Sequence, residues 1–498
     1  MRIFFLLILA MFVSACSSTH HTVYSKDLQS CFNHLITFKQ EVKRQQVRDG
    51  QVINDKTFPY LAFDRFSQSQ LQRIETENDR RQWLDYTSQL ATHQRQAEFN
   101  NLIINPFDLP VLDYCADKLT EEAKHNDRVW EQINQQQISV ADSYEPWLRV
   151  FGLYPLSSRV AQSSIDKEKK RILLGFSENG FNEPDSRTRQ YQIAQSHITQ
   201  SFAQDRNSES ASLISQVKIE EWFSDALIES TIGWPMLSDN QISRLYHYYS
   251  PLIKIENRTY DDIPGTVRYL ANEQQPAVDP SKPAIYLHHS YTQLYGKTYL
   301  QLNYSLWFAN RTPTSSFDPY AGKFDGVLLR LTLDHQGRPL LLDSIHHCGC
   351  YHMVFNLTGR FEFNNPRPDV ETPLMFQRLV PTGSSSWSVT LSHREHMIKQ
   401  LDWYDQDPAT EAQSLPLKPV YYDQLRQLPT SKKHTVSLFN QRGMLPSSER
   451  LESTYLWLFG IPSAGAMRQL GHHAIAFVGI RHFDEPKLFE QIIRPVEP

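Results

Sequence analysis

The chain has 498 residues, more than one hydrophobic core usually supports, so two or three folding units are expected. Apolar residues make up 40% and charged residues 21%, a balance that excludes a disordered polymer. The 50 Lys and Arg residues against 55 Asp and Glu give a net charge of −5, which leaves no basic excess for nucleic-acid phosphates and excludes nucleic acid as the expected partner.

The first fifteen residues have the layout of an export signal. Arg2 precedes eleven apolar residues, 3–13, and Ser14 and Ala15 follow as the small residues of a cleavage site. As a helix the apolar run would span about 17 Å, against about 30 Å for the hydrocarbon core of a bilayer. Residues 1–15 are therefore predicted to be a signal peptide and not a membrane span.

The residues around the cleavage site carry a resemblance to a known class. Val13-Ser14-Ala15-Cys16 resembles the lipobox of bacterial lipoproteins, which implies cleavage before Cys16 and acylation of that residue. Residues 16–25 would then be a polar tether, with the lipid bilayer as partner. Ser17 at the sorting position implies the outer membrane of a two-membrane cell envelope, facing the periplasm. The alternative is an ordinary secretory signal followed by a chance cysteine.

Four further cysteines fit an oxidising compartment, where disulfides persist. Cys31 and Cys115 are predicted to form a disulfide; they lie 84 positions apart, so the bond would contribute on the order of 4 kcal/mol to stability. Cys348 and Cys350 are separated only by Gly349. A bridge between them would need a sharp bend and would be comparatively easy to reduce.

The predicted fold class is α+β, a helical N-terminal region followed by a mainly antiparallel β domain. Two segments of the helical region, 26–182, place apolar residues at helical spacing, and helical character returns over 120–133. The first pattern comprises Leu28, Cys31, Phe32, Leu35 and Val42, and the second Trp83, Leu84, Thr87, Leu90 and Ala91. Residues 183–283 are predicted to be a polar linker and mixed connecting region, because they are rich in polar residues and proline.

The apolar pattern changes from helix to strand in residues 284–498, the predicted antiparallel β-rich domain. Alternation predicts strands over 300–308 and 327–333, and the second strand is followed by a turn over 334–339 and a return strand over 340–346. Shorter apolar runs predict further strands at 387–391, 436–438, 455–459 and 474–480.

No common catalytic signature occurs in the chain, so its catalytic residues are unknown at this level. The densest group of reactive side chains is His346, Cys348, Cys350 and His352, which would share one face of an extended chain. A bend at Gly349 would gather some of them. Cys and His side chains select Zn²⁺ or Cu⁺, and His288 is a possible further ligand, but no cofactor is certain.

Other interpretations of this cluster stay open. A tight turn closed by a Cys348–Cys350 disulfide is the simpler one, and a labile redox bridge or a cysteine nucleophile are alternatives. His393 and His396 are expected in a solvated turn.

The favoured function is that of a membrane-anchored envelope lipoprotein that binds or interacts with an envelope protein, glycan or lipid near the membrane. The alternative is a metal- or thiol-dependent enzyme, or a metal carrier, acting on envelope material through His346, Cys348, Cys350 and His352.

Overall fold

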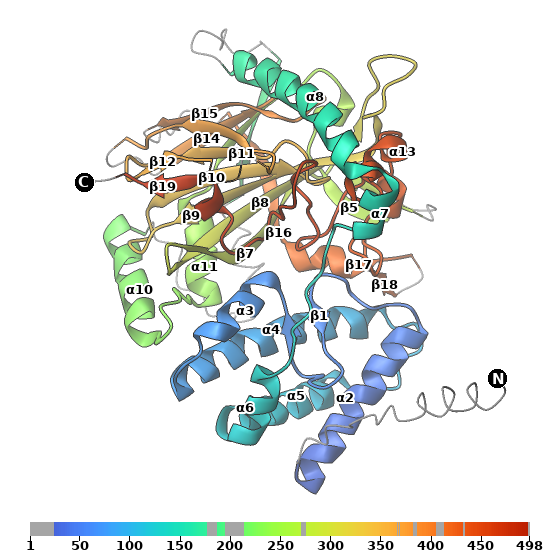
Figure 1. Ribbon diagram of the computed structural model, residues 1–498, viewed down its shortest axis with the longest axis vertical. Helices are drawn as coiled ribbons and strands as arrows, with labels where there is room; N and C mark the ends of the chain where they lie inside the picture. Colours follow the sequence, from blue (N-terminus) through green and yellow to red (C-terminus); the bar gives the residue numbers. More distant parts are fainter. Residues whose placement is uncertain are drawn as a thin grey trace, which may run out of the picture.

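The computed structural model describes residues 24–176, 187–194, 214–269, 275–365, 367, 369–381, 386–404, 413–431 and 434–496. The predicted signal peptide and Cys16 lie outside these residues. Helices gather at the N-terminal end of the molecule and a large curled sheet forms the rest (Figure 1). The predicted α+β class is confirmed.

The N-terminal region is a layer of helices with one short hairpin. Helix α4 begins at a capping box: the Thr76 side chain accepts a hydrogen bond from the Asp79 N–H, and the Asp79 carboxylate accepts one from the Thr76 N–H. The elements are α2 (Lys26–Arg44), β1 (Ile53–Asn54), β2 (Ala62–Phe63), α3 (Arg65–Gln70), α4 (Glu77–Asn101), α5 (Leu109–His125) and α6 (Asp127–Asn134).

The predicted disulfide is confirmed. Cys31 on α2 and Cys115 on α5 are bonded, with their Cα atoms 4.8 Å apart. Both cysteines lie on the apolar faces through which these helices pack, because Leu35 and Phe38 of α2 and Leu112 and Leu119 of α5 are buried in the same core. The bond therefore fixes two helices that already share a hydrophobic contact.

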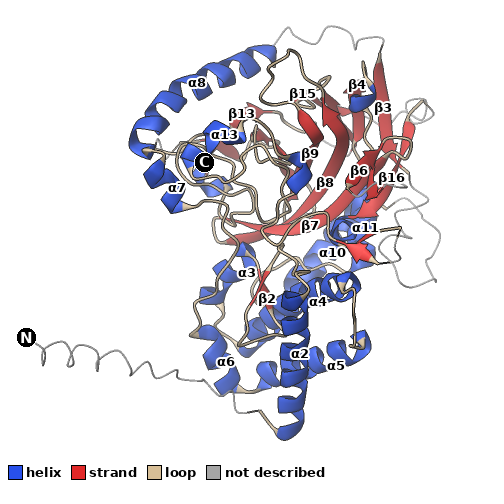
Figure 2. Ribbon diagram, turned by 90° about the vertical axis from the view of Figure 1, so that its right-hand side faces the viewer, coloured by secondary structure: helices blue, strands red, loops and turns tan. Residues whose placement is uncertain are grey.

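The remaining helices lie on the sheet or beside it. Figure 2 shows α7, α8 and α13 together on one side of the curled sheet, away from α10 and α11. These helices are α7 (Pro146–Phe151), α8 (Tyr154–Gly175), α10 (Gln216–Glu229), α11 (Asp239–Tyr248) and α13 (Ser453–Leu456).

Within the described ranges the main sheet has eleven strands, most of them from the predicted β domain. In spatial order they are β13 (Leu374–Gln377), β11 (Met353–Asn356), β10 (Pro339–His346), β9 (Gly322–Leu333), β8 (Lys297–Arg311), β7 (Ala284–Leu294), β16 (Leu415–Tyr421), β3 (Thr188–Ile193), β4 (Leu252–Glu256), β14 (Ser386–Leu391) and β15 (Ile398–Tyr404). Smaller pairs are β5 (Thr266–Tyr269) with β6 (Pro276–Asp279), β12 (Phe361–Phe363) with β19 (Ile493–Pro495), and β17 (Leu428–Pro429) with β18 (Thr435–Val436).

Hairpins build one half of this sheet and long-range pairings build the other. Strands β7 to β11 are consecutive antiparallel neighbours, as the alternation predicts. Strand β16 pairs in parallel with both β7 and β3, and β14 pairs in parallel with β4. Strands β3 and β4 come from residues 183–283, so part of the predicted connecting region belongs to the sheet.

The turn between β9 and β10 follows directly from its sequence. The Asp334 carboxylate accepts hydrogen bonds from the N–H groups of Gln336 and Arg338, and Gly337 adopts φ +68°. This turn sets the register in which Leu342 lies opposite Leu331. The same register places His346, at the end of β10, opposite Val327 of β9.

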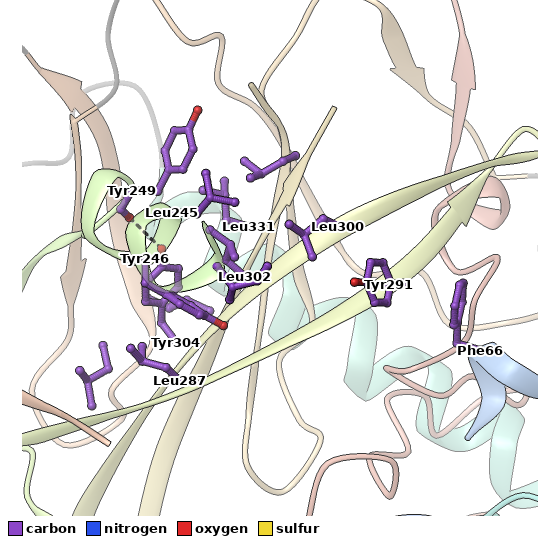
Figure 3. Packing of buried hydrophobic residues seen from close by; sticks show 14 of the residues in the cluster. Phe66, Leu245, Tyr246, Tyr249, Leu287, Tyr291, Leu300, Leu302, Tyr304 and Leu331 are labelled. Atoms are coloured by element: carbon purple, nitrogen blue, oxygen red, sulfur yellow. Dashed lines mark hydrogen bonds between the residues drawn. The ribbon is translucent and has the colours of Figure 1, made fainter. Parts of the chain in front are cut away.

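One hydrophobic core joins the helical layer to the sheet (Figure 3). Phe66 of α3 stacks on Tyr291 of β7 with ring centroids 5.5 Å apart. Deeper in the core the Tyr304 hydroxyl donates to the Tyr249 carbonyl at 2.9 Å, and the Trp387 indole N–H donates to the same carbonyl. The polar ends of these large side chains are therefore satisfied within the core.

Two strand predictions are wrong. Residues 455–459 form part of α13 and a following 3-10 turn, Trp457–Phe459. Residues 474–480 form a loop with one isolated bridge, Ala474 to His482. Ala474, Ile475 and Ala476 are nevertheless buried, so their apolar character reflects burial and not strand pairing.

The described part of the chain contains no helix with both the length and the apolar character needed to cross a bilayer.

Candidate functional site

A cavity of about 730 Å³ lies beneath helix α8. The helix presents one face to it at intervals of three and four residues, as expected for one side of an α-helix. The α8 residues along the cavity are Leu156, Ser157, Val160, Ala161, Ser164, Ile165, Glu168, Lys169 and Ile172. In Figure 1 this helix runs above the strands, with α7 and α13 at its N-terminal end.

The other walls of the cavity are also largely apolar. They come from the loop that was predicted to be a strand, from the segment after α13 and from β13. The residues are Ala474, Ile475, Ala476, Phe477, Phe459, Ile461, Ala464 and Leu374. Leu153, Leu156 and Val160 line the cavity and are themselves exposed, so its open side is apolar. Helix α7, which precedes α8 in the chain, extends this exposed apolar surface with Trp147, Val150 and Phe151.

The floor of the cavity is the tight turn that follows β10. The Gly349 N–H donates to the His346 carbonyl at 2.8 Å, and the His346 N–H donates to the Cys350 carbonyl at 3.0 Å. Gly349 has φ +91°, and a Cβ atom there would lie 2.2 Å from the Ala474 carbonyl oxygen. Only glycine fits this position, and its bend turns Cys348 and Cys350 toward the cavity.

The two cysteines of the turn are free thiols. The Cys350 N–H donates to the Cys348 sulfur at 3.4 Å. A hydrogen bond from the Cys350 thiol lowers the pKa of Cys348, and the same bond together with burial raises the pKa of Cys350. The two sulfurs are therefore unequal: Cys348 ionises more readily than Cys350.

Buried charges lie behind the turn. Asp325 accepts a hydrogen bond from His396 Nδ1 at 2.8 Å and from an Arg450 guanidinium nitrogen at 3.2 Å. Burial would raise the pKa of Asp325, but the His396 hydrogen bond and the Arg450 charge outweigh it and lower the pKa below its usual range. Arg311 also lines the cavity, and one of its guanidinium nitrogens lies 3.8 Å from the Glu395 carboxylate.

Glu452 lines the same cavity and is 4% exposed. Burial raises its pKa to about 7, despite the opposing charges of Arg450 and Arg311. Gly465 lies against this side chain, with a would-be Cβ 2.1 Å from Glu452 Oε1. A carboxyl group that is half protonated near neutral pH is suited to giving or taking a proton.

His346 and His352 line the cavity as well, so the predicted cluster is assembled around one space. Burial lowers the pKa of His346 to about 3, and its Nε2 atom has no hydrogen-bond partner within the described residues. His352 Nε2 lies 3.1 Å from the Asp343 carboxylate, which is also held by Arg330. His346 is a neutral ring at the floor, whereas His352 belongs to a buried ion-pair network.

His288 does not join the cluster. It lies on β7 in a second cavity, where its neighbours include His289, His93 and Tyr421. Burial lowers the pKa of His288 to about 3. No group of three or more His, Cys, Asp or Glu side chains within the described ranges is arranged to hold a metal ion. The expected zinc or copper site therefore gains no support from this geometry.

The expectation of a solvated turn at His393 and His396 fails for His396, which is fully buried. Its ring stacks on Phe308 with centroids 3.7 Å apart and lies between Asp262 and Asp325. Burial would lower the pKa of His396, but the two carboxylates outweigh it and raise the pKa above its ordinary value.

Sequence reasoning missed Arg311, Asp325, Arg450 and Glu452. These residues come from three separate segments, and no spacing links them to the cysteines.

Comparison with known proteins gives no match, whether to a family model, a curated protein or a solved structure.

Proposed function

We propose that this protein is a lipoprotein of the cell envelope, tethered through acylated Cys16, that binds the acyl chain of a lipid in the cavity beneath α8. The observation that carries the proposal is the composition of that cavity. Most of its wall residues are apolar, apart from the charged side chains of Glu168, Lys169 and Glu371, and further polar side chains gather at its floor. A molecule with a long apolar body and one polar substituent matches this arrangement.

The size of the cavity suits such a ligand. Small-molecule sites commonly enclose about 300–1,000 Å³, and this cavity is about 730 Å³. Each buried methylene contributes about 0.8 kcal/mol, so about ten of them contribute roughly 8 kcal/mol before the costs of binding. The costs of association reduce this gross figure, so the affinity depends on how many methylene groups the cavity encloses.

The open side of the cavity would allow an alkyl chain to enter. Leu153, Leu156 and Val160 are more than half exposed at the edge of the cavity, so an alkyl chain that enters there passes over apolar side chains. A polar group on the alkyl chain would then lie at the floor of the cavity, where Arg311 offers hydrogen-bond donors. A glycan is less suitable, because its hydroxyl groups would lie against apolar walls without partners.

The proposal is tested by photocrosslinking on the full chain in lipid nanodiscs. A palmitate analogue with a diazirine near the end of its chain is bound and irradiated, and labelled peptides are identified by mass spectrometry. We expect labels on α8 and on residues 474–477.

Two variants of α8 give a matched comparison. Ala161 is half-buried and lines the cavity, whereas Ser163 is exposed and does not. Ala161→Trp should weaken labelling about tenfold, because an indole displaces the equivalent of two or more methylene groups. Ser163→Trp should leave labelling unchanged. Equal labelling of both variants, or labels confined to peptides away from the cavity, would contradict the proposal.

A further inference from the structure

The cavity floor holds two thiols of unequal character within one turn. Cys348 accepts the Cys350 N–H at 3.4 Å, and the bend at Gly349 keeps both sulfurs against the same space. Arg468, buried and next in space to the turn, donates its backbone N–H to the His347 carbonyl at 2.8 Å. The hydrogen bond from Cys350 and the charge of Arg450 lower the pKa of Cys348 against the opposing effects of burial and Glu452, and Arg468 adds a positive charge beside the turn. The arrangement provides one nucleophilic sulfur and one thiol beside it.

A proton donor lies at the same floor. Glu452 lines the cavity with the two cysteines, and its burial keeps it protonated up to about neutral pH. His346 is also present but is neutral over the same pH range. Glu452 is thus the residue placed to protonate an oxygen that leaves during a reaction at Cys348.

The geometry favours attack on a peroxide over attack on an ester. Ester cleavage is commonly assisted by backbone N–H groups aimed at the oxyanion of a tetrahedral intermediate. In this turn the Gly349 N–H is bonded to the His346 carbonyl and the Cys350 N–H to the Cys348 sulfur, so neither is free for that role. Reduction of a peroxide forms no tetrahedral intermediate, since only an O–O bond breaks, and a second thiol beside the first resolves the product.

We propose that Cys348 and Cys350 reduce a hydroperoxide group carried on the acyl chain that occupies the α8 cavity; this inference rests on the proposed lipid binding. The Cys348 thiolate attacks the terminal peroxide oxygen, so that an S–O bond forms and the O–O bond breaks. Glu452 gives its proton to the departing oxygen, which leaves as the lipid alcohol. Cys348 is then a sulfenic acid.

The second step closes a disulfide. The Cys350 sulfur attacks the Cys348 sulfur, the S–S bond forms, and the S–O bond breaks as the hydroxyl takes the Cys350 proton and leaves as water. The two thiols lose two electrons in total, and the hydroperoxide gains them. One chain therefore reduces one hydroperoxide and stops in the disulfide state.

The test is a single-turnover reaction of the full chain in nanodiscs, with Cys348 and Cys350 reduced. One equivalent of a linoleic acid hydroperoxide is added, and the alcohol is measured by chromatography while the cysteines are measured by peptide mass spectrometry. We expect about one alcohol per chain and a new Cys348–Cys350 disulfide. Hydrogen peroxide should react at least about tenfold more slowly at equal concentration, because it gains no binding from buried methylene groups.

Three variants separate the roles of the residues. Cys348→Ser should form no alcohol. Cys350→Ser should still form it but should stop at a sulfenic acid that dimedone traps at Cys348. Glu452→Gln should slow alcohol formation and remove its dependence on pH near 7.

Binding of unoxidised linoleate is measured in parallel, so the two proposals fail separately. Linoleate that binds while its hydroperoxide is left unreduced would overturn this inference alone. Absence of linoleate binding would overturn the proposed function. Alcohol formation by Cys348→Ser at the wild-type rate would also overturn the inference.

Discussion

Gly349 lies against the backbone of Ala474 so closely that a Cβ atom at residue 349 would be 2.2 Å from the Ala474 carbonyl oxygen. This contact joins the thiol turn to the loop that forms a wall of the cavity. The contact fixes the thiol turn against the apolar wall of the cavity, so the shape of the cavity depends on glycine at position 349.

Replacing this glycine should disturb both stability and thiol chemistry. Gly349→Ala combines a close contact with φ +91°, and should lower the free energy of unfolding by about 3 kcal/mol. Urea unfolding measures the stability, and the alkylation rate of Cys348 reports on the turn. Gly359→Ala is the matched control, since no atom lies within 4 Å of its would-be Cβ. Equal behaviour of the two variants would show that the turn does not need glycine.

The Cys31–Cys115 disulfide should stabilise the helical layer. The bond joins α2 to α5 across a separation of 84 residues, and its loss should cost about 4 kcal/mol by the chain-entropy model. A Cys31→Ala, Cys115→Ala double variant, unfolded in urea and followed by circular dichroism, measures this cost. The reduced wild-type protein is the control, because it lacks the bond but keeps both side chains. Unfolding midpoints that do not move in either sample would contradict the prediction.

Glu452 should make stability depend on pH in a defined direction. Its pKa is about 7 in the folded protein and ordinarily 4.5, so between these values the folded state holds a proton that the unfolded state has lost. Its contribution is fully present below about pH 4.5 and falls as pH rises through 7, by on the order of 3 kcal/mol.

Glu452→Gln isolates this effect, because the amide does not titrate. Relative to wild type, the variant should gain stability between pH 5 and pH 8, as measured by urea unfolding at both values. A difference between the two proteins that stays constant with pH would show that Glu452 titrates normally.

The lipid anchor should depend on a single residue. Cells labelled with an alkyne analogue of palmitate should yield a labelled protein, with the modification on Cys16 as the first residue of the mature chain. Cys16→Ser should abolish the label and prevent cleavage at this site. Cys31→Ser, which removes a different cysteine, should keep the label. Detection of a protein that retains Met1 and carries no acyl group would contradict the proposed lipid anchor.

Local patterns allowed much of the fold to be predicted. The hairpin from β9 to β10 follows from alternation and from the Asp334 and Gly337 turn, both of which lie within a few residues. The parallel pairing of β16 with β3 and β7 joins segments more than a hundred residues apart, and no local pattern specifies it. Residues 474–477 are apolar because they line a cavity, and a short buried loop has the same composition as a short strand.

The candidate site also has a part that the sequence predicts and a part that it does not. His346, Cys348, Cys350 and His352 are adjacent in the sequence, so their clustering could be predicted. Glu452 and Arg450 reach the site from another segment, and their importance comes from burial beside the thiols, which spacing does not encode. His288 was a possible partner by residue type alone, and the sheet places it in a different cavity.

A crystal structure of the protein soaked with a bromine-labelled palmitate would locate the bound acyl chain. We expect an anomalous bromine peak inside the α8 cavity, between Ile165 or Ile172 of the helix and Phe477 of the facing loop. Bromine peaks found only elsewhere on the molecule, with the cavity free of ligand density, would contradict the proposed lipid binding.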